Sequence, residues 1–208
     1  MTSRFYAADL AAYNSGILHG IWVDATSDAD EMQEQIAAML RASPCPNVTV
    51  EHPETNETVP SAEEWVVHDY DDAAKLISHM GETSDLKAIA EAAEAFEEIS
   101  DDYHETILPF LLDWVRDRVT EPHAWKAALD DAFAGEWNDP EDYAADLAEQ
   151  CGYLENLPDA LQNYIDFRAM ARDMALGGEM DFICTSTGQH LQNYDNMRGR
   201  ECIALRNL

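Results

Sequence analysis

The side chains of this sequence that could do chemistry are mostly carboxylates, and many of them recur one helical turn apart. Asp142 and Asp146 are four residues apart, as are Asp113 and Asp117, so each pair falls on one face of a helix. Like charges at this spacing cost a helix about 0.2–0.5 kcal/mol per pair, and an interleaved Lys would remove the cost. Carboxylate pairs are too abundant for any one of them to indicate a general acid and base. We therefore expect rows of surface charge and no catalytic pair.

The sequence patterns of common catalytic and metal sites are missing. The chain contains no GxSxG, P-loop or GxGxxG, and its 7 histidines form no HExxH. His68-Asp69 could be half of the metal-binding motif of a phosphohydrolase. No His-rich helix pattern follows it, which favours an ordinary pair at a strand end. We predict a protein that is not an enzyme and that binds no metal and no cofactor.

The cysteines and the apolar segments indicate the cellular compartment of the protein. Cys45, Cys151, Cys184 and Cys202 form no CxxC and no regular framework, which favours reduced thiols in a cytosol over a disulfide scaffold or a zinc site. A Cys nucleophile would also need an electropositive setting, and this chain offers the opposite field. The first six residues lack the apolar region of a secretory signal, and no apolar run reaches the roughly 18–20 residues of a membrane span. We expect a soluble protein of the cytoplasm.

The net charge narrows the choice of partner. The 208 residues include 42 Asp and Glu against 12 Lys and Arg, a formal charge of -30, while 46% are hydrophobic. That much apolar residue can build folded cores, so the acid is not that of a disordered tail. Phosphates would be repelled, which argues against nucleic acid and for a partner that is itself basic. Charge alone leaves two other interpretations open, namely ordinary solvated faces and the acid-rich proteins of a halophilic host.

Residues 1–78 are predicted to form a small α/β domain. Ser27-Asp28-Ala29-Asp30 resembles a capping box that opens a helix over residues 28–40. A polar stretch leads from that helix to the last strand of the domain. The expected strands are residues 4–10, 17–25 and 65–68, with a turn at 13–16.

Residues 79–128 are predicted to form a central helical domain, and residues 129–208 a C-terminal α+β domain. The central helix from about residue 83 carries an apolar stripe of Leu86, Ile89, Ala90, Ala93 and Phe96. Further helices are expected from Pro109, over 123–134, over 140–151, and from Pro158 and Asp166. Closing strands are expected at 181–184 and 202–205, which makes the fold class α+β.

The candidate functional residues are the carboxylates on the outer faces of these helices. On the helix from Pro140, Tyr143, Leu147 and Cys151 are predicted to face inward, opposite an acidic face. The last thirty residues hold only four acidic and three basic side chains, so the acidic face lies before residue 179. The candidates are Glu91, Glu94, Glu98, Asp101, Asp102, Glu105, Asp113, Asp117, Asp130, Asp131, Asp142, Asp146 and Glu149.

The density of this charge has a physical counterpart. Carboxylates one helical turn apart are separated by about 5.4 Å along the axis. Duplex DNA carries one charge per about 1.7 Å of axis, so thirty charges correspond to about 50 Å of duplex. A protein of this kind could fill a DNA-binding channel and use the Lys and Arg contacts that bind the polymer.

Three segments, in order along the chain, carry a family resemblance. Residues 13–25 read YNSGILHGIWVDA, residues 63–70 read EEWVVHDY, and residues 158–167 read PDALQNYIDF and continue to Met174. Together they resemble the recurrent segments of the ArdA antirestriction proteins. Each segment alone is moderately specific, and their order and rough spacing also agree with that family.

The resemblance implies a function and a partner. Members of that family are elongated, DNA-mimicking dimers encoded on mobile elements such as plasmids. Each protomer is a chain of three small domains, α/β, helical and α plus β, with the dimer contact in the last. They occupy the DNA-binding groove of type I restriction-modification enzymes, and their antirestriction segment would fall near residues 144–158 here. We thus expect a homodimeric inhibitor, and the alternative is an acidic module that binds another basic DNA-binding protein.

Overall fold

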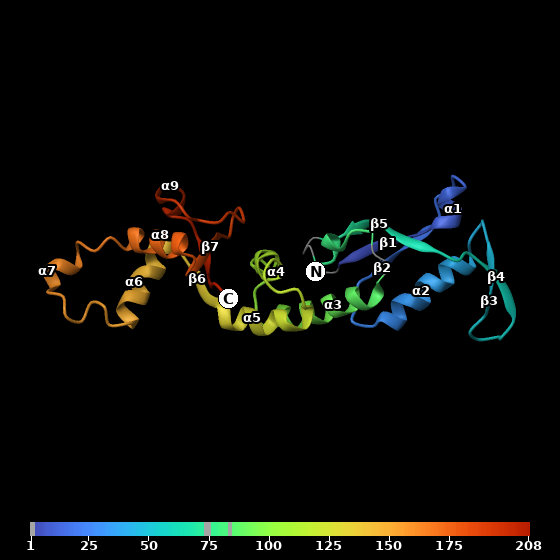
Figure 1. The fold of residues 1–208 in the computed structure, drawn as a ribbon, viewed down its shortest axis with the longest axis horizontal. Coiled ribbons are helices and arrows are strands. Elements are labelled where there is room, and N and C mark those ends of the chain that lie inside the picture. The colour runs from blue at the N-terminus through green and yellow to red at the C-terminus, as the bar shows by residue number, and fades with distance from the viewer. Residues whose placement is uncertain (1–2, 73–75, 83–84) are drawn as a thin grey trace. The chain divides into compact units, whose positions relative to one another are not determined.

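The computed structural model describes residues 3–72, 76–82 and 85–208 (Figure 1). The fold is α+β, as predicted, and the described residues contain three small antiparallel sheets. The chain packs into two compact units. The first comprises Met1–Asp113 and Glu121–Ala124, and the second Trp114–Thr120 and Trp125–Leu208. The division into three domains at residues 78 and 128 stays a prediction.

The first unit is built on a three-stranded sheet. Strand β1 (Arg4–Asp9) lies between β2 (Gly20–Asp24) and β5 (Trp65–Asp71) and is antiparallel to both. Phe5, the second residue of β1, is fully buried and stands opposite Val23 of β2. The three predicted strands are thereby confirmed, with β2 shorter than expected.

Helix α2 (Ala29–Arg41) lies along this sheet (Figure 1) and buries Met32 and Ile36 completely. The Asp28 carboxylate accepts hydrogen bonds from the N–H groups of Asp30 (3.0 Å) and Glu31 (2.9 Å), which begins the helix where the sequence predicted it.

Two elements of the first unit were not predicted. The turn expected at residues 13–16 begins inside a short helix, α1 (Leu10–Asn14), because the buried Asp9 carboxylate caps it at the N–H of Ala12 (3.1 Å). The polar stretch after α2 folds into the hairpin of β3 (Val48–Glu51) and β4 (Thr58–Ser61). Its alternating half-buried valines are too few to give a clear strand signal.

The helices that follow keep the period read from the sequence. After the 3-10 turn η1 (Ser78–Met80), helix α3 (Leu86–Ser100) starts at the Asp85 cap. All five residues of its predicted apolar stripe are at most 9% exposed. Helix α4 (Leu108–Arg116) and the 3-10 turn η2 (Pro122–Ala124) come next.

The second unit closes on a sheet of strand order β6-β8-β7. Strands β7 (Met180–Cys184) and β8 (Cys202–Arg206) confirm the predicted closing strands. Helix α5 (Trp125–Ala132) is followed directly by strand β6 (Phe133–Trp137), so the helix expected over 123–134 was wrong at its last two residues. The reason is long-range pairing, since β6 is held by β8 some seventy residues later.

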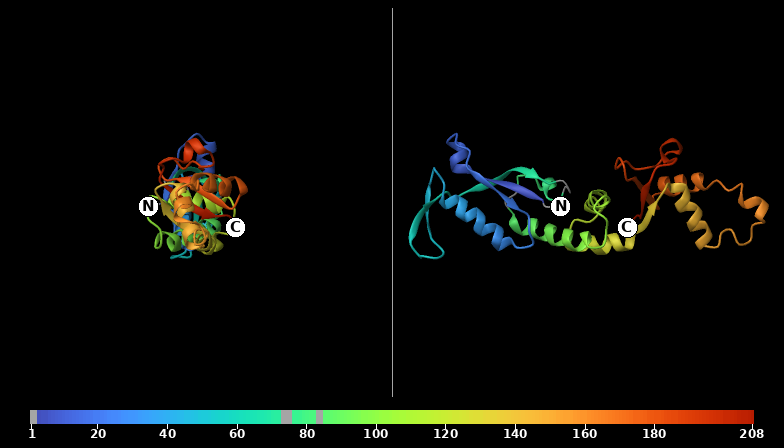
Figure 2. Two further views of the ribbon diagram at one scale, coloured as in Figure 1. Left: turned by 90° about the vertical axis from the view of Figure 1, so that its left-hand side faces the viewer. Right: turned by 180° about the vertical axis from the view of Figure 1, so that it is seen from behind.

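Two helices pack on this sheet, α6 (Pro140–Gln150) and α8 (Phe167–Gly177). Between them the chain passes through α7 (Asp159–Gln162), which lies away from the sheet in Figure 1 and in the reverse view of Figure 2. A last short helix, α9 (Tyr194–Met197), precedes β8. Tyr143 and Leu147 of α6 face the core as predicted, but Cys151 is exposed, because it caps the end of the helix.

Candidate functional site

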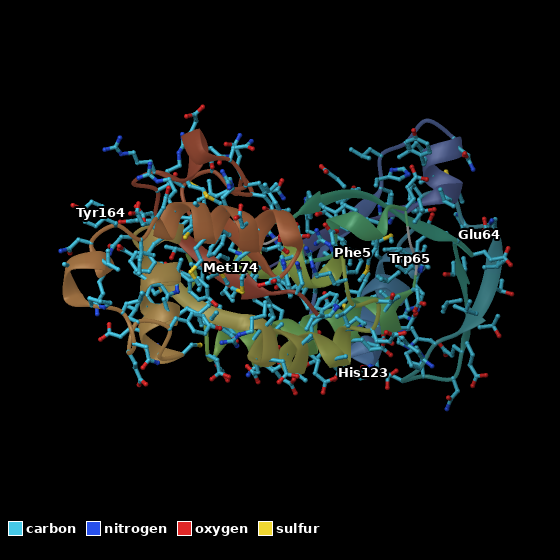
Figure 3. All side chains as sticks on the ribbon, turned by 60° about the vertical axis from the view of Figure 1, so that its left-hand side comes forward. Phe5, Glu64, Trp65, His123, Tyr164 and Met174 are labelled. Atoms are coloured by element: carbon cyan, nitrogen blue, oxygen red, sulfur yellow. The ribbon has the colours of Figure 1, made fainter. Side chains whose placement is uncertain are left out.

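The candidate functional residues are carboxylates on the helices of each unit, taken one unit at a time. Of the thirteen candidate carboxylates, eleven are exposed, and Asp113 and Asp146 are half-buried. In Figure 3 oxygen atoms, drawn in red, stand at the tips of many side chains that point outward from the ribbon. The surface is therefore formed by solvated groups and not by a cleft.

Helix α3 holds the densest row of this surface. Glu91, Glu94 and Glu98 are exposed, opposite the buried stripe, and Glu97 is exposed beside them. From Glu91 to Glu98 the axis rises about 10.5 Å, in steps of about 4.5, 4.5 and 1.5 Å, so the three steps between these four carboxylates average about 3.5 Å. The sequence prediction missed Glu97, although its place three residues after Glu94 indicated the same side of the helix.

The row continues beyond the end of α3. Asp101 is the C-cap residue of the helix, and Asp102 and Glu105 follow in the turn that leads to α4. All three side chains are exposed. The first unit thus presents six predicted carboxylates between residues 91 and 105, before the half-buried Asp113 of α4.

The carboxylates around α5 are partly compensated. Asp130 lies one turn after Lys126, whose Nζ is 2.6 Å from both carboxylate oxygens. Asp131 and Asp117 are exposed. Arg118, the next residue after Asp117, pairs with the buried Asp181 at 2.6 Å.

Helix α6 carries a row whose carboxylates are held by neutral partners. The Asn138 side-chain amide donates to Asp142 at 2.8 Å, and the Gln150 amide donates to Asp146. Glu149 is exposed on the last turn. An amide donor fixes the direction of a carboxylate without cancelling its charge. These partners therefore orient negative charge at the surface.

Several of the few Lys and Arg side chains pair with carboxylates that are not candidate functional residues. Five arginines form ion pairs with carboxylates outside the candidate set, within both units. Those pairs are Arg4–Asp71, Arg41–Glu34, Arg118–Asp181, Arg168–Glu141 and Arg172–Asp173. At least five of the 12 Lys and Arg side chains therefore serve other carboxylates.

Asp181 contrasts with the surface carboxylates because it is buried. It accepts hydrogen bonds from Trp114 Nε1 (2.8 Å) and Arg118 (2.6 Å), and His190 Nδ1 lies 3.3 Å away. Burial alone would raise the pKa of this carboxyl, but the hydrogen bonds from His190 and Trp114 and the charge of Arg118 lower it overall. This carboxylate holds the fold together and is not available to a partner.

Three further expectations concern the His68-Asp69 pair, metal binding and membrane spans. His68 and Asp69 lie in the middle of β5 and not at a strand end as expected, because the strand continues to Asp71, and His68 packs against the ring of Tyr13 with centroids 4.6 Å apart. Among the described residues, no group of three or more His, Cys, Asp or Glu side chains could hold a metal ion. No helix in the described part of the chain has the length and apolar character needed to cross a membrane.

Fold and surface together define an α+β protein with extended acidic faces on its helices. The profile of the antirestriction protein (ArdA) family matches residues 5–189, which include all three segments that carried the resemblance. The chain belongs to the ArdA antirestriction family, so its function is antirestriction and its partners are restriction-modification enzymes. A comparison with curated proteins gives no match.

Proposed function

We propose that this chain inhibits type I restriction-modification enzymes by occupying their DNA-binding groove as a mimic of duplex DNA. The observation that carries the proposal is the row on α3, where exposed carboxylates follow in unequal steps that average about 3.5 Å along the axis. Phosphates of one DNA strand follow at about 3.4 Å along the axis. The row therefore has an average density of negative charge similar to that of one DNA strand, and Lys and Arg side chains that contact phosphates would meet carboxylates at a comparable density.

The proposed mechanism is competition without turnover and without a cofactor. Bound carboxylates replace phosphates on the basic groove, and the attraction is long-range, steered by the charge of -30. Because the effect is spread over many side chains, no single carboxylate is essential. The amide partners of Asp142 and Asp146 support this mechanism, since a carboxylate that is already oriented loses less conformational entropy on binding.

We extend the proposal to a homodimer that acts in the cytoplasm, with its dimer contact in the predicted C-terminal domain. Large apolar side chains are exposed around α7 in that domain, namely Tyr153 (62%), Leu161 (52%) and Tyr164 (85%). Figure 3 shows Tyr164 at the outside of this segment. An exposed apolar group of this size is typical of a protein contact. Sedimentation equilibrium tests the dimer, and a monomer at all concentrations would contradict it.

A competition assay tests the inhibitory mechanism. The methyltransferase core of a type I enzyme is held on labelled duplex DNA, and this protein is titrated in at two salt concentrations. We expect stoichiometric displacement that weakens as salt rises, because salt screens the attraction between the carboxylates and the basic groove. Circular dichroism in the same buffers checks that the protein stays folded.

The opposite result would point to the alternative partner. If the folded protein displaces no DNA at either salt concentration, the type I groove is not its target. The acidic surface would then serve another basic DNA-binding protein, and the same displacement assay with such a protein on its own DNA would identify it. An unfolded protein at low salt would instead support the halophilic interpretation of its acidity.

A further inference from the structure

Two of the four cysteines face each other across the sheet of the second unit. In the antiparallel pair of β7 and β8, Cys184 is the register partner of Cys202. Partners that are directly opposite in an antiparallel pair project from the same face of the sheet. Both residues belong to one buried core cluster, at 1% and 0% exposure, beneath Tyr143 and Ala144 of α6. The two thiols therefore share one small volume of the core.

The hydrogen bonds around Cys184 and Cys202 show whether they form a hydrogen-bonded or a non-hydrogen-bonded pair of the two strands. The N–H of Thr185 donates to the carbonyl of Glu201 at 3.1 Å, which makes the neighbouring pair a hydrogen-bonded one. The N–H of Cys184 instead donates away from β8, to the carbonyl of Gln189 at 2.9 Å. Cys184 and Cys202 thus form a non-hydrogen-bonded pair, in which Cα atoms are about 4.5 Å apart. Disulfides join Cα atoms about 4.4–6.8 Å apart, so the backbone already fits a bridge.

The two thiols differ in reactivity. Burial would raise the pKa of Cys184, but hydrogen bonds from the side chains and N–H groups of Ser186 and Thr187 outweigh it and lower the pKa to about 7. The Ser186 hydroxyl lies 3.2 Å from the Cys184 Sγ. Burial and the nearby Asp139, together with Cys184 itself, raise the pKa of Cys202 to about 12. Cys184 is therefore the nucleophile of the pair and Cys202 its partner thiol.

We propose that Cys184 and Cys202 form an intramolecular disulfide when the protein meets a peroxide. The Cys184 thiolate attacks one oxygen of hydrogen peroxide, the O–O bond breaks, and the leaving hydroxide takes a proton to become water. The Cys202 thiol then attacks the sulfur of the Cys184 sulfenic acid. The S–S bond forms as the S–O bond of the sulfenic acid breaks, and the hydroxyl leaves with the Cys202 proton as a second water. Two thiols are oxidised by two electrons, and one peroxide is reduced to two waters.

The bridge changes the stability of the second unit. It closes a loop over residues 185–201, which includes α9 and the buried Leu191 and Met197 of the same core. Cross-linking this loop restricts the unfolded chain, so the oxidised protein resists unfolding more than the reduced one. The sheet that supports α6 and α8 is then fixed covalently at β7 and β8. This inference does not depend on the inhibitory mechanism proposed above.

The test uses the full chain with both cysteines of the pair intact. Cys45→Ser and Cys151→Ser remove the two thiols outside the pair, one of them exposed. After titration with hydrogen peroxide, we expect the intact mass to fall by two hydrogens and the peptides that contain Cys184 and Cys202 to be linked. The midpoint of thermal unfolding rises by roughly 5–10 °C, and dithiothreitol reverses both changes.

A matched control separates a bridge from simple oxidation. In the same background, Cys202→Ser leaves the Cys184 thiol without a partner, so peroxide gives a sulfenic acid that dimedone traps, with no rise of the midpoint. The proposal is overturned if the protein with both cysteines gains oxygen atoms at Cys184 while Cys202 can still be alkylated. It is equally overturned if both thiols stay unreacted across the titration. The decisive readout is made on protein in which Cys184 and Cys202 are both unchanged, so it does not depend on how the Cys202→Ser control folds.

Discussion

At the scale of single residues, the same side-chain type serves two purposes that burial separates. Exposed carboxylates such as Glu94 stay solvated and keep their charge, whereas Asp181 is 9% exposed and has three donors around it. A buried charge is tolerated only when it is paired and hydrogen-bonded. The sequence could not distinguish Asp181 from the surface set, because Trp114 and Arg118 are more than sixty residues away from it along the chain.

Replacing Asp181 tests its structural role. We expect Asp181→Asn to lower the free energy of unfolding by about 1–3 kcal/mol, because Arg118 and Trp114 lose a charged acceptor in a partly buried place. Urea denaturation followed by fluorescence measures it. The matched control is Asp117→Asn, an exposed carboxylate next to Arg118 in the chain, which should change stability by less than about 0.5 kcal/mol. Equal effects of the two substitutions would show that Asp181 is not a structural anchor.

The pair of Asp181 and His190 also gives the stability a pH dependence. The hydrogen bond to Asp181 raises the pKa of His190, so its contribution is complete below about pH 6.5 and is lost as pH rises through the raised value. The pKa of Asp181 is lowered, so its contribution holds above about pH 3.9 and is lost only at more acidic pH. We expect wild type to lose more stability than His190→Gln between about pH 6.5 and 8.5. If the free energy of unfolding changes with pH in the same way for both proteins, the Asp181–His190 pair does not cause the pH dependence.

At the scale of elements, local signals were readable in the sequence and long-range pairing was not. Helices α2 and α6 begin where the sequence predicted them, because a cap is written within a few residues of the helix it starts, and α3 begins after its cap Asp85, near its expected start. The first two residues of strand β6 were taken for helix and the rest of it was not predicted as a strand, since its partner β8 lies far along the chain. The exposure of the acidic rows followed from the helical period. The Lys126–Asp130 ion pair shows that the charge of one member is compensated by a neighbouring cation.

The cap of α6 positions one acidic row and can be tested. The Asp139 carboxylate accepts a hydrogen bond from the N–H of Asp142 at 3.1 Å and another from the N–H of Gly199 at 3.2 Å. Asp139→Ala should lower the free energy of unfolding by about 1 kcal/mol, because two donors lose their acceptor. Asp139→Asn keeps one oxygen acceptor and should cost less. Denaturant titration measures both variants, and an Ala variant as stable as wild type would contradict the role of the cap.

At the scale of the whole molecule, the charge of -30 has two separable effects. It creates a general field that attracts any basic partner, and in the proposed mechanism it also presents particular rows of carboxylates to a groove built for DNA. Net charge can be changed equally at different places, so the two effects can be told apart. Five of the acidic side chains outside the candidate set lie in or near the β3–β4 hairpin, and they are exposed like those of the α3 row.

Two blocks of six neutralisations make that comparison. The first replaces Glu by Gln and Asp by Asn in the α3 row and its continuation, and the second replaces Glu by Gln elsewhere in the first unit. The first block is Glu91, Glu94, Glu98, Asp101, Asp102 and Glu105, and the second is Glu51, Glu54, Glu57, Glu63, Glu64 and Glu82. Displacement of DNA from a type I methyltransferase core at a series of salt concentrations gives the affinity and its salt slope.

We expect the α3 block to weaken binding tenfold or more and to flatten the salt slope, because fewer phosphate-like contacts are then made, each worth roughly 0.9 in the slope for duplex DNA. The second block should keep most of the affinity, although its net charge is the same. A single change such as Glu94→Gln should have little effect, since the contacts are distributed. If both blocks weaken binding equally, attraction by net charge explains the inhibition, and the spacing of the α3 row has no part in it.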